Sequence, residues 1–123
     1  MEEMERVLKK IEEILARESS YKFEAYSFVM AGLHYTVSKL SRPRHVTGQE
    51  LCEGLRDYAL EQFGPMARTV LEYWGIRSTV DFGKIVFLLI EAELLKKTEE
   101  DSLHDFENVY DFDQAFQYEI KEE

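Results

Sequence analysis

One short stretch near the middle of the chain carries the clearest local signal, a loop followed by the start of a helix. Pro43 has no backbone N–H and restricts the residue before it, so residues 41–45 are predicted to form a loop. Thr47 and Glu50 then have the T-x-x-E spacing of a capping box, in which each side chain accepts a hydrogen bond from the other residue's backbone. We therefore expect a helix to start at Gly48.

Apolar residues recur at three- and four-residue steps along most of the chain, which is typical of amphipathic helices. Five helices are expected, at residues 2–18, 22–40, 48–63, 65–74 and 79–96. The unbroken apolar run of residues 85–90 is also compatible with a buried strand. The length of its segment, an N-terminal cap and the absence of proline favour a helix that is apolar nearly all round. The predicted fold class is therefore mainly all-α, a compact domain of five helices.

The length of the chain, 123 residues, is about that of one domain. Such a chain can bury a hydrophobic core without disulfides or metals. We expect a single domain over residues 1–123. It comprises an N-terminal amphipathic helix (2–18), a helical core (22–97) and an acidic, aromatic C-terminal segment (98–123).

The apolar stripe of the first predicted helix is narrow, close to the a and d positions of two heptads. It consists of Met4, Val7, Leu8, Ile11, Ile14 and Leu15. Such a stripe can dock on the rest of the domain or pair with a second copy, and for two heptads docking is favoured. A homodimer through residues 2–18 stays an open alternative.

Cysteine use and the N-terminus indicate the compartment. Cys52 is the only cysteine, so the chain can form no internal disulfide and no four-cysteine metal site. The first residues are acidic and lack the apolar stretch of a signal peptide. The longest apolar run, residues 85–90, is far too short to span a membrane. We therefore expect a cytoplasmic protein without a membrane partner.

The net charge of −10 is concentrated near the C-terminus, where residues 98–123 hold ten acids and one base. The same segment is rich in aromatic residues. It can solvate the domain, fold back onto the basic loop at residues 42–44, or dock on a basic partner, and these three interpretations stay open. The candidate interaction residues of this segment are Phe106, Tyr110, Asp111, Phe112 and Asp113.

A basic loop offers a second candidate interaction site. Arg42, Arg44 and His45 lie in a stretch that holds one acid and four bases over residues 21–47. Guanidinium groups suit phosphates and carboxylates, although an ordinary solvated loop also explains these residues. The loop makes a divergent winged-helix-like nucleic-acid-binding protein the alternative function.

Two further patterns bear on that alternative. Residues 65–96 have helix-turn-helix proportions, and the apolar alternation over residues 116–120 permits a short strand. However, the helix that would read DNA starts with an acid and large apolar residues and has few cations near it. Nucleic acid would also repel an acidic protein. A helical hairpin that serves the core is therefore the favoured interpretation.

No motif for catalysis or for a cofactor is present. Asp101, His104 and Asp105 are an imaginable set of metal ligands, but solvated surface residues explain them more simply. Cys52 lies near the start of its predicted helix, where a thiol can become reactive, yet a partly buried structural thiol is favoured. We assign no catalytic, cofactor-binding or metal-binding residues and expect no cofactor.

Four short motifs resemble those of a known protein family. They are HVTGQEL at residues 45–51, QFGPMA at 62–67, DFG at 81–83 and KTEED at 97–101. Together they are similar to a family of hypothetical proteins described as restricted to the planctomycete–verrucomicrobial group, over roughly residues 20–115. The resemblance implies a bacterial, cytoplasmic, single-domain protein, and it implies no activity and no functional residues.

The leading hypothesis is a non-enzymatic protein-interaction module, an adaptor or regulator that binds another cytoplasmic protein. It rests on the lack of catalytic motifs together with the acidic, aromatic C-terminal segment. The nucleic-acid binder is the alternative. An enzyme or metal protein of unknown chemistry comes third.

Overall fold

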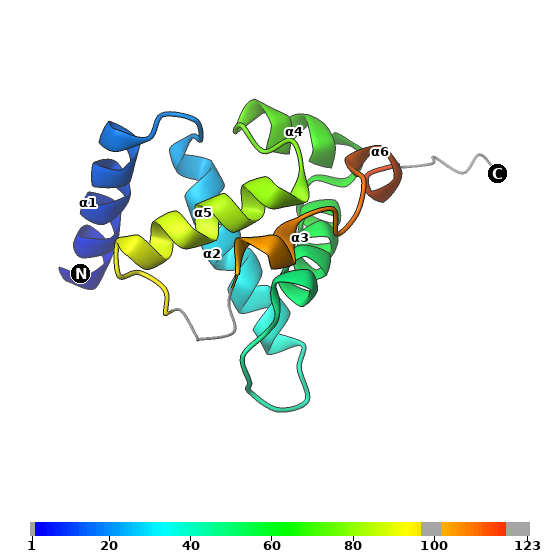
Figure 1. Cartoon of the computed structure of the whole chain (residues 1–123), viewed down its shortest axis with the longest axis horizontal. Helices are drawn as coiled ribbons and strands as arrows, with labels where there is room; N and C mark the ends of the chain where they lie inside the picture. Colours follow the sequence, from blue (N-terminus) through cyan, green and yellow to red (C-terminus); the bar gives the residue numbers. More distant parts are fainter. Residues whose placement is uncertain (1, 97–101, 118–123) are drawn as a thin grey trace.

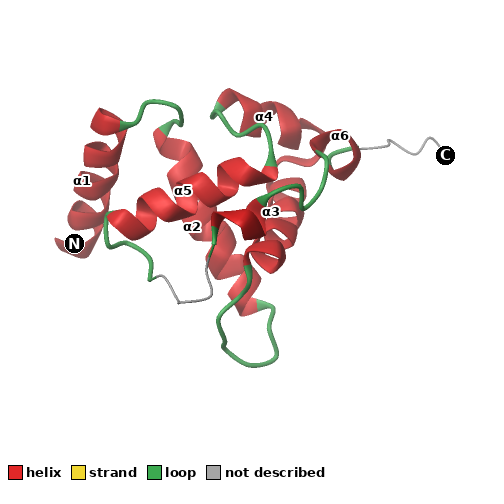
Figure 2. Ribbon diagram, in the orientation of Figure 1, coloured by secondary structure: helices red, strands yellow, loops and turns green. Residues whose placement is uncertain are grey.

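The computed structural model describes residues 2–96 and 102–117, and all regular structure in these residues is helical (Figure 2). The elements are α1 (Glu2–Arg17), α2 (Phe23–Ser38), α3 (Gly48–Phe63), η1 (Gly64–Met66), α4 (Ala67–Tyr73), α5 (Thr79–Glu91), η2 (Leu103–Phe106) and α6 (Phe112–Ala115). The predicted all-α class is confirmed. None of these helices is long and apolar enough to cross a membrane.

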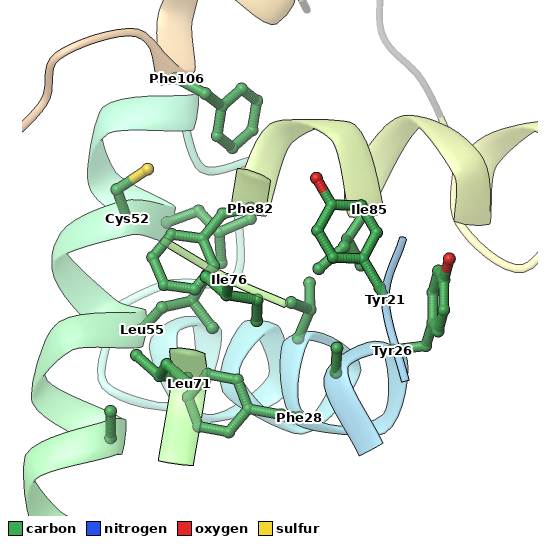
Figure 3. Packing of buried hydrophobic residues seen from close by; sticks show 14 of the residues in the cluster. Tyr21, Tyr26, Phe28, Cys52, Leu55, Leu71, Ile76, Phe82, Ile85 and Phe106 are labelled. Atoms are coloured by element: carbon green, nitrogen blue, oxygen red, sulfur yellow. The ribbon is translucent and has the colours of Figure 1, made fainter. Parts of the chain in front are cut away.

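The core forms where α5 lies across the pair α2 and α3 (Figure 1). Helix α1 stands at one end of this arrangement against α2, and α4 lies at the other end against α3. The 3₁₀ turn η2 packs on both α5 and α3. Tyr26, Leu55, Phe82, Ile85 and Leu89 are among the fully buried side chains at the centre, most of them seen in Figure 3.

Helix α1 docks on the rest of the chain, as its narrow stripe predicts. Ile11 and Ile14 are buried in the common core. The Lys10 ammonium also donates a hydrogen bond to the carbonyl oxygen of Ala92, at 2.8 Å, which ties α1 to the end of α5. Met4 and Leu8, earlier in the stripe, remain exposed. Docking therefore uses only part of the stripe, and the homodimer through residues 2–18 stays a prediction.

The capping box predicted at Thr47 is present, and the N-terminal cap expected for the last long helix is a second capping box. At the start of α3, the Thr47 hydroxyl accepts from the Glu50 N–H at 3.1 Å, and Glu50 Oε1 accepts from the Thr47 N–H at 2.9 Å. At the start of α5, Ser78 and Asp81 form the second box. The Asp81 carboxylate additionally accepts a hydrogen bond from the Tyr21 hydroxyl, which links the start of α5 to the turn between α1 and α2.

Helices α4 and α5 end in the same way, and this shortens α5. After α4, Gly75 has a φ of 97°, and the Ile76 N–H donates to the Leu71 carbonyl at 2.9 Å. This is the Schellman arrangement, in which the left-handed residue is usually glycine. After α5, Glu93 adopts the left-handed conformation with a φ of 63°, and the Leu94 N–H donates across the turn at 2.9 Å.

The prediction that the last long helix runs to residue 96 is therefore wrong by five residues. No glycine or proline stands near Glu93 to mark the stop. The turn instead lets Leu94 and Leu95 pack against the core, and this burial offsets the strain of a left-handed glutamate.

Residues 102–117 pack on the domain's own core. Phe106, Phe112 and Phe116 are buried. The Phe106 ring lies so close to α5 that a Cβ added at Gly83 would stand 2.6 Å from it. Of the three interpretations of the acidic segment, residues 102–117 follow the one in which the segment folds back onto its own domain. They fold onto α3, α4 and α5, however, and the contacts described here do not centre on the loop at residues 42–44.

Hydrogen bonds fix this segment. The Thr79 hydroxyl donates to the Phe106 carbonyl at 2.6 Å and accepts from the Val109 N–H at 3.2 Å. The Tyr110 hydroxyl donates to the Cys52 carbonyl at 2.7 Å. Of the predicted strand at residues 116–120, Phe116 follows helix α6 directly, and residues 118–120 lie outside the described part of the chain.

Candidate functional site

A cavity of about 230 Å³ lies beneath the loop that precedes α3. Its walls come from α2, the start of α3, the second half of α5 and η2. The lining residues are Leu33, Val37, Arg44, His45, Val46, Thr47, Gly48, Leu51, Val86, Phe87, Ile90, Leu95, Lys96 and Phe106. Most of these side chains are aliphatic or aromatic, so the cavity is suited to an apolar group.

The apolar character of α5 explains why the cavity exists. Phe82, Ile85 and Leu89 form its buried face. Val86 and Ile90, on a neighbouring face, are only half-buried and line the cavity. A helix that is apolar all round is expected to be covered on every side. Here the chain covers one face of α5 incompletely, and the uncovered part is the cavity wall.

Within residues 2–96 and 102–117, the side chains of the lining that can carry a charge are all basic. They are Arg44, His45 and Lys96, and no aspartate or glutamate of these described residues belongs to the lining. This contrasts with the chain as a whole, which has 25 acids and 15 lysines and arginines. The described part of the lining therefore differs in charge from the chain as a whole.

Arg44 is held in place by Glu50. Its guanidinium donates two parallel hydrogen bonds to the carboxylate, at 3.0 Å and 2.7 Å. This geometry, together with the bond from the Thr47 N–H, lowers the pKa of Glu50 to about 2. The same pair raises the pKa of Arg44. Because Glu50 is fixed by the capping box, it positions Arg44 at the cavity while neutralising part of its charge.

The structure brings together only some of the predicted interaction residues. Arg44 and His45 line the cavity, and the buried Phe106 ring forms part of its wall. Arg42 is exposed on the same loop outside the lining. Of the predicted docking residues, the aromatic Phe106 and Phe112 are buried in the chain's own core.

The acidic members of the predicted docking set have structural partners. Asp111 caps α6 by accepting a hydrogen bond from the Asp113 N–H at 2.8 Å. The Asp113 carboxylate pairs with Arg68 of α4. Arg68, Arg77, Tyr110 and Asp111 line a separate polar hollow, which shares no described lining residue with the cavity.

Cys52 is a structural thiol. It is fully buried on the inner side of α3, and burial raises its pKa to about 12. The start of the helix therefore does not activate it, since desolvation dominates. A neutral, inaccessible thiol does not act as a nucleophile.

Of the imagined metal ligands, the structure describes His104 and Asp105. His104 Nδ1 lies 3.2 Å from Glu107 Oε2, an exposed contact within one turn. Asp101 lies outside the described residues. In the part of the chain that the structure describes, no three His, Cys, Asp or Glu side chains converge in a way that could hold a metal ion.

Helix α5, which would be the reading helix of a helix-turn-helix, packs against α2, α3 and η2. Thr79, in its first turn, is buried beneath the C-terminal segment. Residues 2–96 and 102–117 also contain no strand that could form a wing. These contacts favour the interpretation of α4 and α5 as a hairpin that serves the core.

No family model, curated protein or solved structure matches this chain. The resemblance to the planctomycete–verrucomicrobial family therefore stays a prediction.

Sequence reasoning identified the loop at the cavity but missed most of the lining. Leu33, Val37, Val86 and Ile90 were expected to be ordinary core residues. One signal was available, because α5 carries more apolar side chains than one buried face needs. Lys96 was missed because the helix was predicted to continue through it.

Proposed function

We propose that this protein is a non-enzymatic binding module that holds an apolar group of its ligand in the cavity beneath residues 44–47. One observation carries the proposal: the cavity has a mostly apolar lining, and the charged side chains among its described lining residues are basic. Binding sites for small ligands are typically concave and apolar, with a few polar groups that orient the ligand. The proposed binding site is thus the cavity with its basic lining residues, and not the acidic C-terminal segment that the sequence suggested.

The surrounding structure supports a preformed site. The capping box and the Arg44–Glu50 pair fix the loop above the cavity. Val46 and Leu51, at the positions of a hydrophobic staple, are both buried and hold the loop against α3. A site of this kind binds with little rearrangement, so less of the binding free energy is spent on ordering.

Filling the cavity tests the proposal. Val86→Phe places a larger side chain into it, and the matched control Val70→Phe makes the same change at a half-buried position of α4 outside it. The probe is 1-octanol, followed by methyl NMR on the full chain. We expect saturable shifts at Leu33 and Ile90 in the wild type and the control and their loss in Val86→Phe. Failure of 1-octanol and of charged octyl compounds to shift these methyl groups in the wild type would overturn the proposal.

A further inference from the structure

We infer that the cavity recognises a small organic carboxylate with an apolar body of about six to eight carbons, the acid group lying beside Arg44 and Lys96. This inference rests on the proposed function and names its ligand class. Three features of the structure lead to it: the volume of the cavity, the charge of its opening and the pairing of Arg44.

The volume sets the size of the apolar body. An apolar cavity of about 150 Å³ holds a benzene molecule. The cavity here measures about 230 Å³, so it has room for a ring with a short substituent or for a bent chain of about six to eight carbons. A long fatty acid exceeds this space.

The charges at the opening indicate the sign and the magnitude of the charge that the ligand carries. Among the described residues there, Arg44 and Lys96 provide two positive charges, and the carboxylate of Glu50 offsets one of them. A single negative charge matches the remainder. A doubly charged phosphate would exceed it and would face the net charge of −10 on the rest of the protein. Local cations on an acidic protein therefore favour a monocarboxylate.

The Arg44–Glu50 pair allows a test in which the variant binds the ligand more tightly, which damage to the fold would not produce. Glu50 competes with a ligand carboxylate for the Arg44 guanidinium. Glutamine serves in a capping box as glutamate does, so Glu50→Gln keeps the acceptor for the Thr47 N–H and removes the competing charge. Binding of a carboxylate should then become tighter, whereas a variant that merely loosens the loop would weaken it.

The experiment compares three probes of equal chain length on the full protein: octanoate, 1-octanol and octylammonium. Binding is measured by NMR titration at neutral pH and low salt. We expect octanoate to bind at least ten-fold more tightly than 1-octanol, and octylammonium to bind more weakly than either. Equal binding of octanoate and 1-octanol in the cavity would overturn the carboxylate inference and leave the proposed function standing. Absence of binding by all three probes would overturn both.

Charge variants separate recognition from packing. Lys96→Gln and Arg44→Gln should each weaken octanoate binding by three- to ten-fold and leave 1-octanol binding unchanged. Lys84→Gln removes an exposed charge from α5 outside the cavity and is the matched control. Glu50→Gln should tighten octanoate binding by at least three-fold. If Glu50→Gln leaves octanoate binding unchanged or weakens it, the acid group does not lie beside Arg44 and the inference is wrong.

Discussion

The hydroxyl group of Tyr26 is buried without compensation, and its removal should stabilise the protein. Tyr26 is fully buried near the start of α2, with its ring edge-on to that of Tyr21 at 6.3 Å (Figure 3). Within the described part of the chain, its hydroxyl has no hydrogen-bond partner. Burial also raises its pKa to about 12. Tyr26→Phe deletes this oxygen and retains the ring.

The expected gain follows from the change in solvation. The hydroxyl is hydrated in the unfolded chain and loses that hydration on folding, which costs about 1–3 kcal/mol when no partner replaces the water. Removal of one oxygen leaves a gap on the order of 10 Å³, which costs only about 0.2 kcal/mol. We therefore expect Tyr26→Phe to raise the free energy of unfolding by about 1 kcal/mol or more. For a chain of this size, that corresponds to a rise in Tm of about 3–5 °C.

A second tyrosine provides the control. The Tyr110 hydroxyl donates to the Cys52 carbonyl at 2.7 Å, so Tyr110→Phe should lower the free energy of unfolding by about 1 kcal/mol. Urea unfolding of both variants and the wild type measures the two effects. The same change, from tyrosine to phenylalanine, is thus expected to raise the free energy of unfolding at residue 26 and to lower it at residue 110. If Tyr26→Phe destabilises the protein as Tyr110→Phe does, the Tyr26 hydroxyl has a partner such as a bound water, and the reasoning is refuted.

Three further predictions concern a turn and two titrating groups. Glu93→Gly should stabilise the protein by about 0.5 kcal/mol in urea unfolding, because the left-handed conformation costs glutamate about 1–2 kcal/mol and glycine gives back part of this as entropy; Glu91→Gly, inside the helix, should destabilise it. Burial raises the pKa of Cys52 from 9.0 to about 12, so stability should fall as the pH rises from 9 towards 12, and Cys52→Ala should flatten this dependence in urea titrations at pH 8–10. Arg44 holds the pKa of Glu50 at about 2 instead of 4.5, so stability present above pH 4.5 should fall as the pH drops towards 2; an unchanged acid profile in Glu50→Gln would contradict this.

The sequence predicted those features of the fold that depend on residues close together in the chain, such as the starts of helices. The capping boxes at Thr47 and Ser78 are short-range patterns, since the side chain and the backbone group it binds are three residues apart. The helix starts at Gly48 and Thr79 followed from them. The left-handed turn at Glu93 could not be predicted, because its stability comes from the packing of the following residues and not from the turn residue itself.

The candidate site and the C-terminal segment depend on contacts between distant residues. Phe106 and Phe112 stand among acids, so the sequence alone leaves open whether they pack on the chain's own core or on a partner, whereas the structure buries both rings against the core. The cavity arises where the coverage of α5 is incomplete. Periodicity shows which residues of a helix are apolar, but not which of them the rest of the chain fails to cover.

The attachment of residues 102–117 to α5 has a consequence for how the protein forms during synthesis. Thr79 and Gly83 can meet Phe106 only after more than twenty further residues have been made. Helices α1 to α5 emerge earlier, with one side of α5 and its apolar residues still facing water. A nascent chain in that state is prone to aggregate or to be bound by chaperones. We therefore expect this exposed state to end when the aromatic residues of 102–117 pack on α5.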